Sequence, residues 1–167
     1  MRAQQNGFTL VELITVMALI GILSAIAFSR FSDTSIYRQA LFIDQLQSFV
    51  RLAQHMSMSQ QGAPFSENSK TTSEFSLVQE SADKWRVSIE NSQHSQSHNL
   101  TMQLGVSVDN QLLPLGQHLI ISFNSQGDIV AKSFPQSADP SLSTVLQIGE
   151  QALCIAPTGF SYEGSCI

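Results

Sequence analysis

The chain has 167 residues, which is the length of one ordinary domain rather than of a multidomain enzyme. Its 8 Lys and Arg and 13 Asp and Glu residues make up 13% of the chain and leave a net charge of −5, a low charge density for a soluble domain. This acidic balance provides no general basic surface for phosphates, so we predict no nucleic-acid partner. With 43% hydrophobic residues the chain is able to bury a core, which excludes disorder over most of its length.

An apolar segment occupies residues 8–29, where Glu12 is the only charged residue. As a helix this segment is about 33 Å long at 1.5 Å per residue, which matches the thickness of a membrane's hydrocarbon core. Its apolar side chains point in all directions, as expected for a helix surrounded by lipid or by other apolar helices. We therefore predict a transmembrane helix at residues 8–29.

Three kinds of segment share this apolar character. A secretory signal would begin at Arg2 and be cut after Ala25-Ile26-Ala27, which would release a soluble domain starting at Phe28. A plain signal anchor accounts for the length but not for Glu12, because a carboxylate inside an apolar segment is costly and usually has a function. The third kind uses its acid in assembly, and the residues around Glu12 favour it.

The residues Gly7-Phe8-Thr9-Leu10-Val11-Glu12 resemble the prepilin motif of type IV pilins and type II secretion pseudopilins. In that motif a short hydrophilic leader ends in Gly and is followed by Phe, by Glu four residues later and by a long apolar stretch. The resemblance implies that residues 1–7 are a leader peptide, which prepilin peptidase removes by cutting between Gly7 and Phe8. It also implies N-methylation of the new amine of Phe8 and retention of the apolar helix in the mature protein.

The mature amine of Phe8 would be a charge at the end of a helix destined for an apolar bundle, and such a charge needs a partner. Glu12 lies four residues further on, about 6 Å along a helix, so its carboxylate reaches the amine of its own chain or of a neighbouring subunit. A pair between subunits would fix the axial register of adjacent helices. We therefore predict an assembly role for Glu12; the alternative is an interfacial acid that the helix dipole favours.

The helix is predicted to continue, as an amphipathic helix, through residues 30–61. Apolar residues recur there every three to four positions, which is the spacing of a helix that packs on a protein core. Gly62-Ala63-Pro64 ends the helix near Gln61. The candidates for its buried face are Ile36, Leu41 or Phe42, Ile43, Leu46, Phe49 or Val50, Ala53 and Met56.

Residues 65–167 alternate apolar and polar positions between turn signals, so we predict a β-rich globular head. The candidate strands are 74–80, 84–90, 100–108, 119–123, 129–132, 145–148 and 152–156, with a loop at 91–99. Their candidate core residues include Phe75, Leu77, Trp85, Val87, Ile89, Leu100, Met102, Leu104, Val106 and Val108. The order of elements predicts an α+β fold, in which a long N-terminal helix packs against an antiparallel head, as in the pilins that the N-terminus resembles.

Cys154 and Cys166 are the only cysteines. An exported head reaches an oxidising compartment, so we expect these two residues to form a disulfide that closes a short C-terminal loop. Two free thiols in a reducing compartment are the alternative. A C-terminal disulfide loop resembles the arrangement common in type IV pilins and is less typical of secretion pseudopilins.

The sequence contains no recognisable enzyme motif, and we expect no catalytic residue, no metal and no cofactor. His94 and His98 have i,i+4 spacing, but they lie in a Ser- and Gln-rich stretch that favours a loop over a helix. The sequence has no Cys-x-x-Cys pair and no closely spaced set of Cys and His, which argues against zinc.

Together these features predict a minor type IV pilin, most similar to the mannose-sensitive haemagglutinin (MSHA) type. The resemblance implies processing by prepilin peptidase and an inner-membrane assembly platform that adds the subunit to a filament of pilin subunits or uses it to prime one. Before assembly the helix would lie in the lipid bilayer of the inner membrane with the head in the periplasm; afterwards the subunit would lie in a surface pilus or a periplasmic pseudopilus. The alternatives are an H-type minor pseudopilin of a type II secretion system and a membrane-tethered or exported binding domain.

Overall fold

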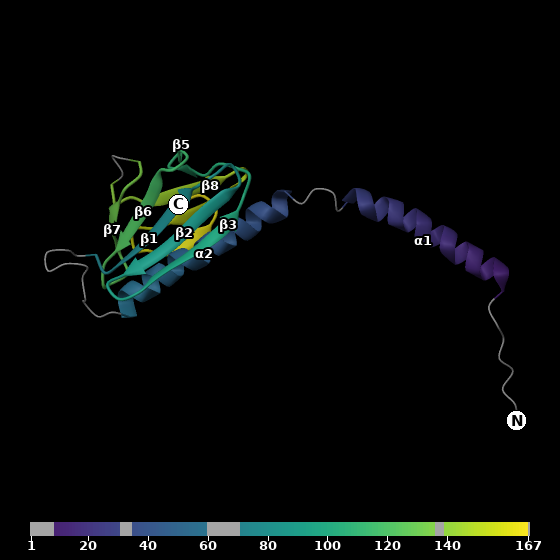
Figure 1. The fold of residues 1–167 in the computed structure, drawn as a ribbon, viewed down its shortest axis with the longest axis horizontal. Helices are drawn as coiled ribbons and strands as arrows, with labels where there is room; N and C mark the ends of the chain where they lie inside the picture. The colour runs from purple at the N-terminus through teal and green to yellow at the C-terminus, as the bar shows by residue number, and fades with distance from the viewer. Residues whose placement is uncertain (1–8, 31–34, 60–70, 136–138, 167) are drawn as a thin grey trace, which may run out of the picture. The chain divides into compact units, whose positions relative to one another are not determined.

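The computed structural model of the protein describes residues 9–30, 35–59, 71–135 and 139–166 (Figure 1). These residues form two helices and ten strands. The helices are α1 (Leu10–Arg30) and α2 (Ser35–Ser59), and the strands are β1 (Ser73–Gln79), β2 (Lys84–Asn91), β3 (Ser95–Thr101), β4 (Ser107–Val108), β5 (Gln111–Leu112), β6 (His118–Phe123), β7 (Ile129–Lys132), β8 (Thr144–Ile148), β9 (Gln151–Ile155) and β10 (Ser161–Glu163). The chain divides into two compact units, Met1–Ile36 and Tyr37–Ile167, and each is described by itself.

The helix α1 has 21 residues and presents apolar side chains on all sides. Two of its hydroxyl groups donate within the helix, since Thr15 donates to the carbonyl oxygen of Glu12 at 2.9 Å and Ser24 donates to that of Ile20 at 2.7 Å. Over the residues described, neither helix has the combined length and apolarity that a membrane crossing requires. The crossing predicted for residues 8–29 is thus not confirmed.

The amphipathic helix predicted within residues 30–61 is present as α2. Its buried residues recur every three to four positions and are Phe42, Ile43, Leu46, Val50, Ala53 and Ser57. Ile36, which the spacing predicts to be buried, is instead 56% exposed, because it precedes the part of α2 that packs on the core of the head. The predicted continuity of the helix across residues 31–34 and the predicted stop near Gln61 lie outside the described residues.

The head contains two five-stranded antiparallel sheets. The strand order is β3-β2-β1-β6-β7 in sheet A and β10-β9-β8-β4-β5 in sheet B. Both sheets and α2 contribute to one hydrophobic core, in which Trp85 of β2 is fully buried and its ring centroid lies 5.9 Å from that of Phe42 of α2. This arrangement confirms the predicted α+β class and fits a pilin-like fold.

Three hairpins follow the local patterns of the sequence. β1 pairs with β2 so that Leu77 lies opposite Val87, and both side chains are buried as predicted. β6 pairs with β7 around a turn in which the side-chain oxygen of Asn124 accepts two backbone N–H groups at 2.9 Å. β8 pairs with β9 around Gly149, whose φ of 60° suits a tight turn. In each case the turn residues lie within a few positions of the strands that they join.

The region after β2 differs from its prediction, because residues 91–99 are not a loop and residues 100–108 are not one strand. The side-chain oxygen of Asn91 accepts the N–H of His94 at 2.6 Å, and the N–H of Asn91 donates to the carbonyl oxygen of His94 at 2.9 Å. This tight turn brings β3 alongside β2. Leu104, a predicted core residue, is consequently 39% exposed. The other apolar candidates of that segment are buried and are Leu100, Met102, Val106 and Val108.

Candidate functional site

The predicted processing site lies at the start of the chain. Thr9 is the first described residue, so Gly7 and Phe8 lie outside the part that the structure describes. The cut between Gly7 and Phe8 and the N-methylation of Phe8 therefore stay predictions.

Thr9 and Glu12 form a capping box at the start of α1. The backbone N–H and the hydroxyl of Thr9 both donate to Oε2 of Glu12 at 2.9 Å. In return, the backbone N–H of Glu12 donates to the hydroxyl oxygen of Thr9 at 3.3 Å. These bonds satisfy N–H groups that the first turn of a helix leaves unpaired. Thr9 is a functional residue that the sequence-based prediction omits, although its Thr-x-x-Glu spacing is the signal of such a cap.

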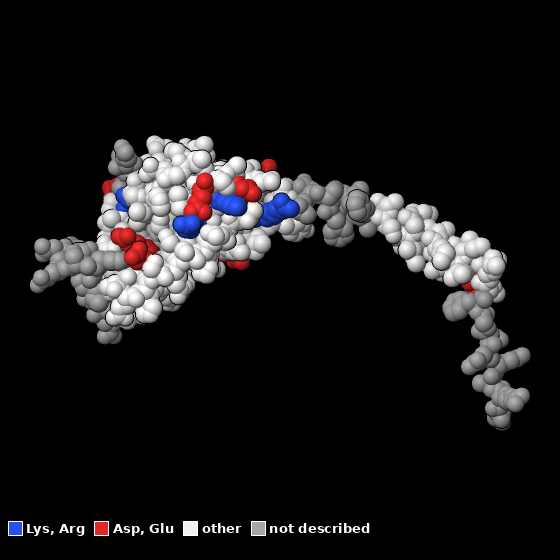
Figure 2. Space-filling model, in the orientation of Figure 1, with Lys and Arg blue, Asp and Glu red and all other residues white. Residues whose placement is uncertain are grey.

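The carboxylate of Glu12 is exposed, and the capping box uses only its Oε2. Within the described part of the chain, Oε1 of Glu12 takes part in no hydrogen bond and no ion pair. Figure 2 shows that the surface of α1 is almost entirely uncharged, whereas charged side chains are spread over the head. Glu12 therefore caps its own helix and also offers an acceptor for a cation on an otherwise apolar surface.

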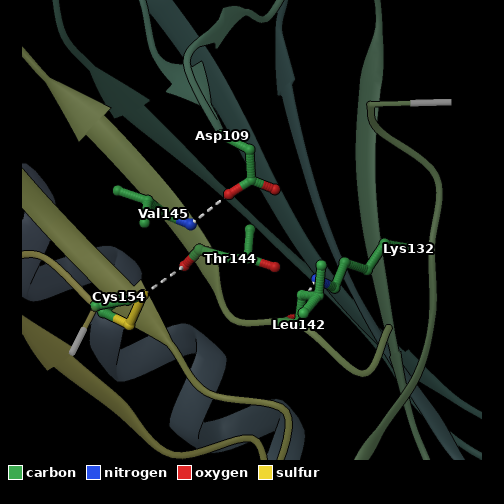
Figure 3. The surroundings of a disulfide bond; sticks show 7 residues. Asp109, Lys132, Leu142, Thr144, Val145 and Cys154 are labelled. Carbon is green, nitrogen blue, oxygen red and sulfur yellow. Dashed lines mark hydrogen bonds between the residues drawn. A yellow bond between two sulfur atoms is a disulfide. The ribbon is translucent and has the colours of Figure 1, made fainter. Parts of the chain in front are cut away.

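The two cysteines form the predicted disulfide, which joins Cys154 of β9 to Cys166 with their Cα atoms 5.2 Å apart. Cys154 is fully buried, and Sγ of Cys166 lies 3.8 Å from the carbonyl oxygen of Thr144 on β8 (Figure 3). A disulfide sulfur has no proton to donate, so this approach is a packing contact. A cysteine binds zinc as its thiolate, so a sulfur in this disulfide is not a zinc ligand. The bond ties the end of the chain to sheet B and encloses β10.

Charged groups near the disulfide bind the backbone. Oδ1 of Asp109 accepts the N–H of Val145 at 2.8 Å, and Nζ of Lys132 donates to the carbonyl oxygen of Leu142 at 2.6 Å (Figure 3). Burial lowers the pKa of Lys132, and the carboxylates of Asp109 and Asp139 oppose this effect. These contacts anchor the segment that leads into β8, and they give the charged groups a structural role.

His94 and His98 do not have the helical spacing that a metal pair would use. His94 lies in the turn between β2 and β3, and His98 lies on β3, where the backbone is extended. The ring of His98 stacks on Phe49 of α2 with centroids 4.9 Å apart and an angle of 27° between the planes. Among the residues that the structure describes, no three His, Cys, Asp or Glu side chains form a group able to hold a metal ion.

A shallow polar groove of about 510 Å³ lies on the face of sheet A that points away from the core. Arg86 and His118 line it, and Arg86 forms an ion pair with Glu80 at 2.6 Å. Nδ1 of His118 lies 3.2 Å from the hydroxyl oxygen of Ser76. No carboxylate within the described ranges hydrogen-bonds to His118, so this Ser–His pair lacks the third member of a catalytic triad.

Comparison with known protein families recognises the N-terminal part of the chain. The sequence model of the family described as the prokaryotic N-terminal methylation motif matches residues 2–28. No curated protein and no solved structure matches the chain. The matched residues include the predicted processing site, the capping box and most of α1. The chain therefore carries the prokaryotic N-terminal methylation motif, which indicates a type IV pilin-like or pseudopilin protein.

Proposed function

We propose that the chain is a minor pilin of the MSHA type, which prepilin peptidase processes and which enters a type IV pilus or primes its assembly. The observation that carries this proposal is the N-terminal methylation motif at residues 2–28. Such a subunit requires a leader, a cut site and a retained apolar helix, and residues 1–29 would supply all three.

The surface of α1 supports assembly through the helix. Its large apolar side chains are between 48% and 73% exposed, and they lie on all sides. A helix of this kind is stable among lipid tails or among other apolar helices, because water is a poor solvent for its surface. The inner membrane would cover α1 before assembly, and the α1 helices of neighbouring subunits would cover it in the filament.

Glu12 supports a defined register in that filament. Thr9 binds Oε2, which orients the carboxylate at the start of the helix, and among the described residues no group donates to Oε1. After processing, the amine of Phe8 on a neighbouring subunit is a cation that would otherwise be buried without a partner. Pairing of the two groups would set the axial offset between adjacent helices.

The disulfide between Cys154 and Cys166 favours the pilus over the secretion pseudopilus. A bond of this kind persists in an oxidising compartment, which agrees with an exported head. C-terminal disulfide loops are common in the type IV pilins that the N-terminus resembles. An H-type minor pseudopilin of a type II secretion system is the second candidate.

Intact mass measurement and N-terminal sequencing of the protein from its native envelope test the proposal. We expect a chain that begins at Phe8 and carries one added methyl group. A chain that begins at Phe28 would mean ordinary signal cleavage and would overturn the proposal. Shearing of the cells then separates the two candidates: a pilus subunit leaves with the surface fibres, whereas a pseudopilin stays in the envelope and its deletion stops protein secretion.

A further inference from the structure

The head has one strand edge that is long and exposed. The four edges of its two sheets are β3 and β7 in sheet A and β5 and β10 in sheet B. β5 has 2 residues, β10 has 3 and β7 has 4, whereas β3 has 7. All residues of β3 except Leu100 are exposed, and within the described ranges α2 reaches the strand through the stack of Phe49 on His98.

β3 also lacks the residues that usually keep sheet edges apart. In natural sheets, charged side chains, prolines, bulges or a short length keep edge strands from pairing with other chains. The other edges of this head follow that rule, since β7 ends in Lys132 and β10 ends in Glu163. Between Asn91 and Val108 the sequence contains no charged residue and no proline. β3 is therefore the edge at which this head is ready to pair with another strand.

In β3, every second residue directs its backbone N–H and C=O groups toward the position of such a strand. The N–H of Asn91 donates to the carbonyl oxygen of His94, which makes these two a hydrogen-bonded pair at the start of the β2–β3 ladder. Hydrogen-bonded pairs recur at every second residue of an antiparallel ladder. Gln96 and His98 therefore bond to β2, and the odd-numbered residues direct their N–H and C=O groups away from the sheet. These residues are Ser95, Ser97, Asn99 and Thr101.

We infer that β3 is a docking edge for the β3 strand of a second copy of this chain, with the two strands antiparallel. The argument for this occupant is that a second copy presents the same four edges, of which, among the residues that the structure describes, only β3 is both long and without Lys, Arg, Asp or Glu. Because the strand contains no Lys, Arg, Asp or Glu, two copies approach without the repulsion that such side chains cause across a strand pair. The contact would be two-fold and would merge the two copies of sheet A into one continuous sheet.

The length of the strand selects the register of this pair. The backbone N–H and C=O groups that point away from one sheet pair with those that point away from the other. With this pairing, all seven residues of β3 overlap only when His98 lies opposite His98 of the second copy. This central pair is not hydrogen-bonded, so its Cα atoms are about 4.5 Å apart. In the same register the two copies of Gln96 are four positions apart, which is about 13 Å at 3.3 Å per residue.

This contact goes beyond the proposed function and does not depend on the N-terminal motif. A two-fold contact closes on itself, so it joins two subunits and does not extend a fibre. Where subunits are carried on fibres, it would join two fibres side by side.

Cysteine cross-linking in the full-length chain tests the inference. The native cysteines are already paired with each other, so a third cysteine is the only free thiol. Under mild oxidation we expect His98→Cys to give at least about tenfold more covalent dimer than Gln96→Cys, since only the shorter Cα distance lies in the range of disulfides. Gln96 is the control because it is exposed and lies on the same strand and the same face, although only His98 stacks on Phe49 of α2.

A proline in the edge then separates strand pairing from other contacts. In the His98→Cys background, Ser97→Pro removes an outward-facing N–H, and proline is tolerated at an edge where its nitrogen faces away from the neighbouring strand. We expect the dimer to be lost while the fluorescence of buried Trp85 is unchanged. No dimer from His98→Cys, equal cross-linking at the two positions, a cross-link to a different protein, or a dimer that survives Ser97→Pro would each overturn the inference.

Discussion

Glu12 caps α1 in the structure, and we propose that it also sets the register of assembly; single substitutions separate the two roles. A Gln at this position still closes a capping box but carries no charge, whereas Thr9→Val keeps the charge and removes the hydroxyl that caps the helix. We expect Glu12→Gln to lower incorporation into fibres by at least about tenfold, and Thr9→Val to lower it far less, because an unpaired buried amine costs more than a lost cap. Immunoblots of sheared fibres measure incorporation, and the mature N-terminus checks processing.

Thr9→Ser is the control for this pair of variants, because it retains the hydroxyl and should behave as the unmodified chain. Normal fibres that contain fully incorporated Glu12→Gln would show that the charge of Glu12 has no part in assembly. A larger defect in Thr9→Val than in Glu12→Gln would assign Glu12 to helix capping alone.

At the scale of elements, α2 connects the two sheets through the turns that lie against it. Nε2 of Gln54 donates to the carbonyl oxygen of Thr158 at 2.8 Å and approaches that of Gly127 at 3.4 Å. Gly127 lies in the β6–β7 turn of sheet A, and Thr158 lies in the β9–β10 turn of sheet B. The two turns also meet directly, since the N–H of Ile129 donates to the carbonyl oxygen of Pro157 at 2.7 Å.

Two glycines with nearly the same φ test how tightly these turns pack. Gly159 has a φ of 76° and Gly116 a φ of 77°, so both lie in the left-handed region, where an alanine is strained. A Cβ on Gly159 would collide with the carbonyl oxygen of Gly127 and the amide of Gln54, whereas one on Gly116 meets nothing within 4 Å. We expect Gly159→Ala to lower the free energy of unfolding by about 1–3 kcal/mol more than Gly116→Ala.

Thermal unfolding followed by Trp85 fluorescence measures this difference, which corresponds to several degrees in Tm. If the two variants lost the same free energy of unfolding, the β9–β10 turn would have to move aside without disturbing α2.

The elements that the sequence predicts are those whose signals are local. The spacing of Phe42, Leu46 and Val50 marks the buried face of α2, and Asn124 marks a hairpin turn within five residues. β3 was not predicted because an edge strand needs no apolar alternation, and its polar sequence has the composition of a loop. The pairing of β1 with β6 joins Phe75 to Ile121, which no short pattern encodes. It follows from the packing of the whole head.

At the scale of the whole molecule, features that neighbouring residues define are again predicted from the sequence, whereas features that depend on distant residues are not. Gly7, Phe8 and Glu12 form a motif that is read directly from neighbouring residues, and the family comparison matches the same stretch. The cysteine pair is equally legible because both residues lie near the C-terminus of an otherwise cysteine-free chain. The core that joins α2 to both sheets depends on contacts between distant residues, so the sequence predicts its class but not its strand order.

That shared core predicts that the disulfide stabilises the whole head. Cys154 and Cys166 are 12 residues apart, and closing a loop of this size contributes about 3 kcal/mol by restricting the unfolded chain. Because one core spans both sheets, we expect reduction of this bond to shift the urea unfolding of Trp85, which lies in sheet A, although the bond lies in sheet B.

Urea titrations of the protein with and without reductant, followed by Trp85 fluorescence, measure the shift. The variant Cys154→Ala/Cys166→Ser is the control, because it should unfold at the midpoint of the reduced protein and should not respond to reductant. A Trp85 transition that reduction leaves unchanged, together with faster proteolysis near β10, would restrict the effect of the disulfide to β10, the edge strand that pairs with β9 alone. A shifted Trp85 transition would instead mean that sheet A, sheet B and α2 unfold as one cooperative unit, so that an oxidising compartment contributes to the stability of the entire head.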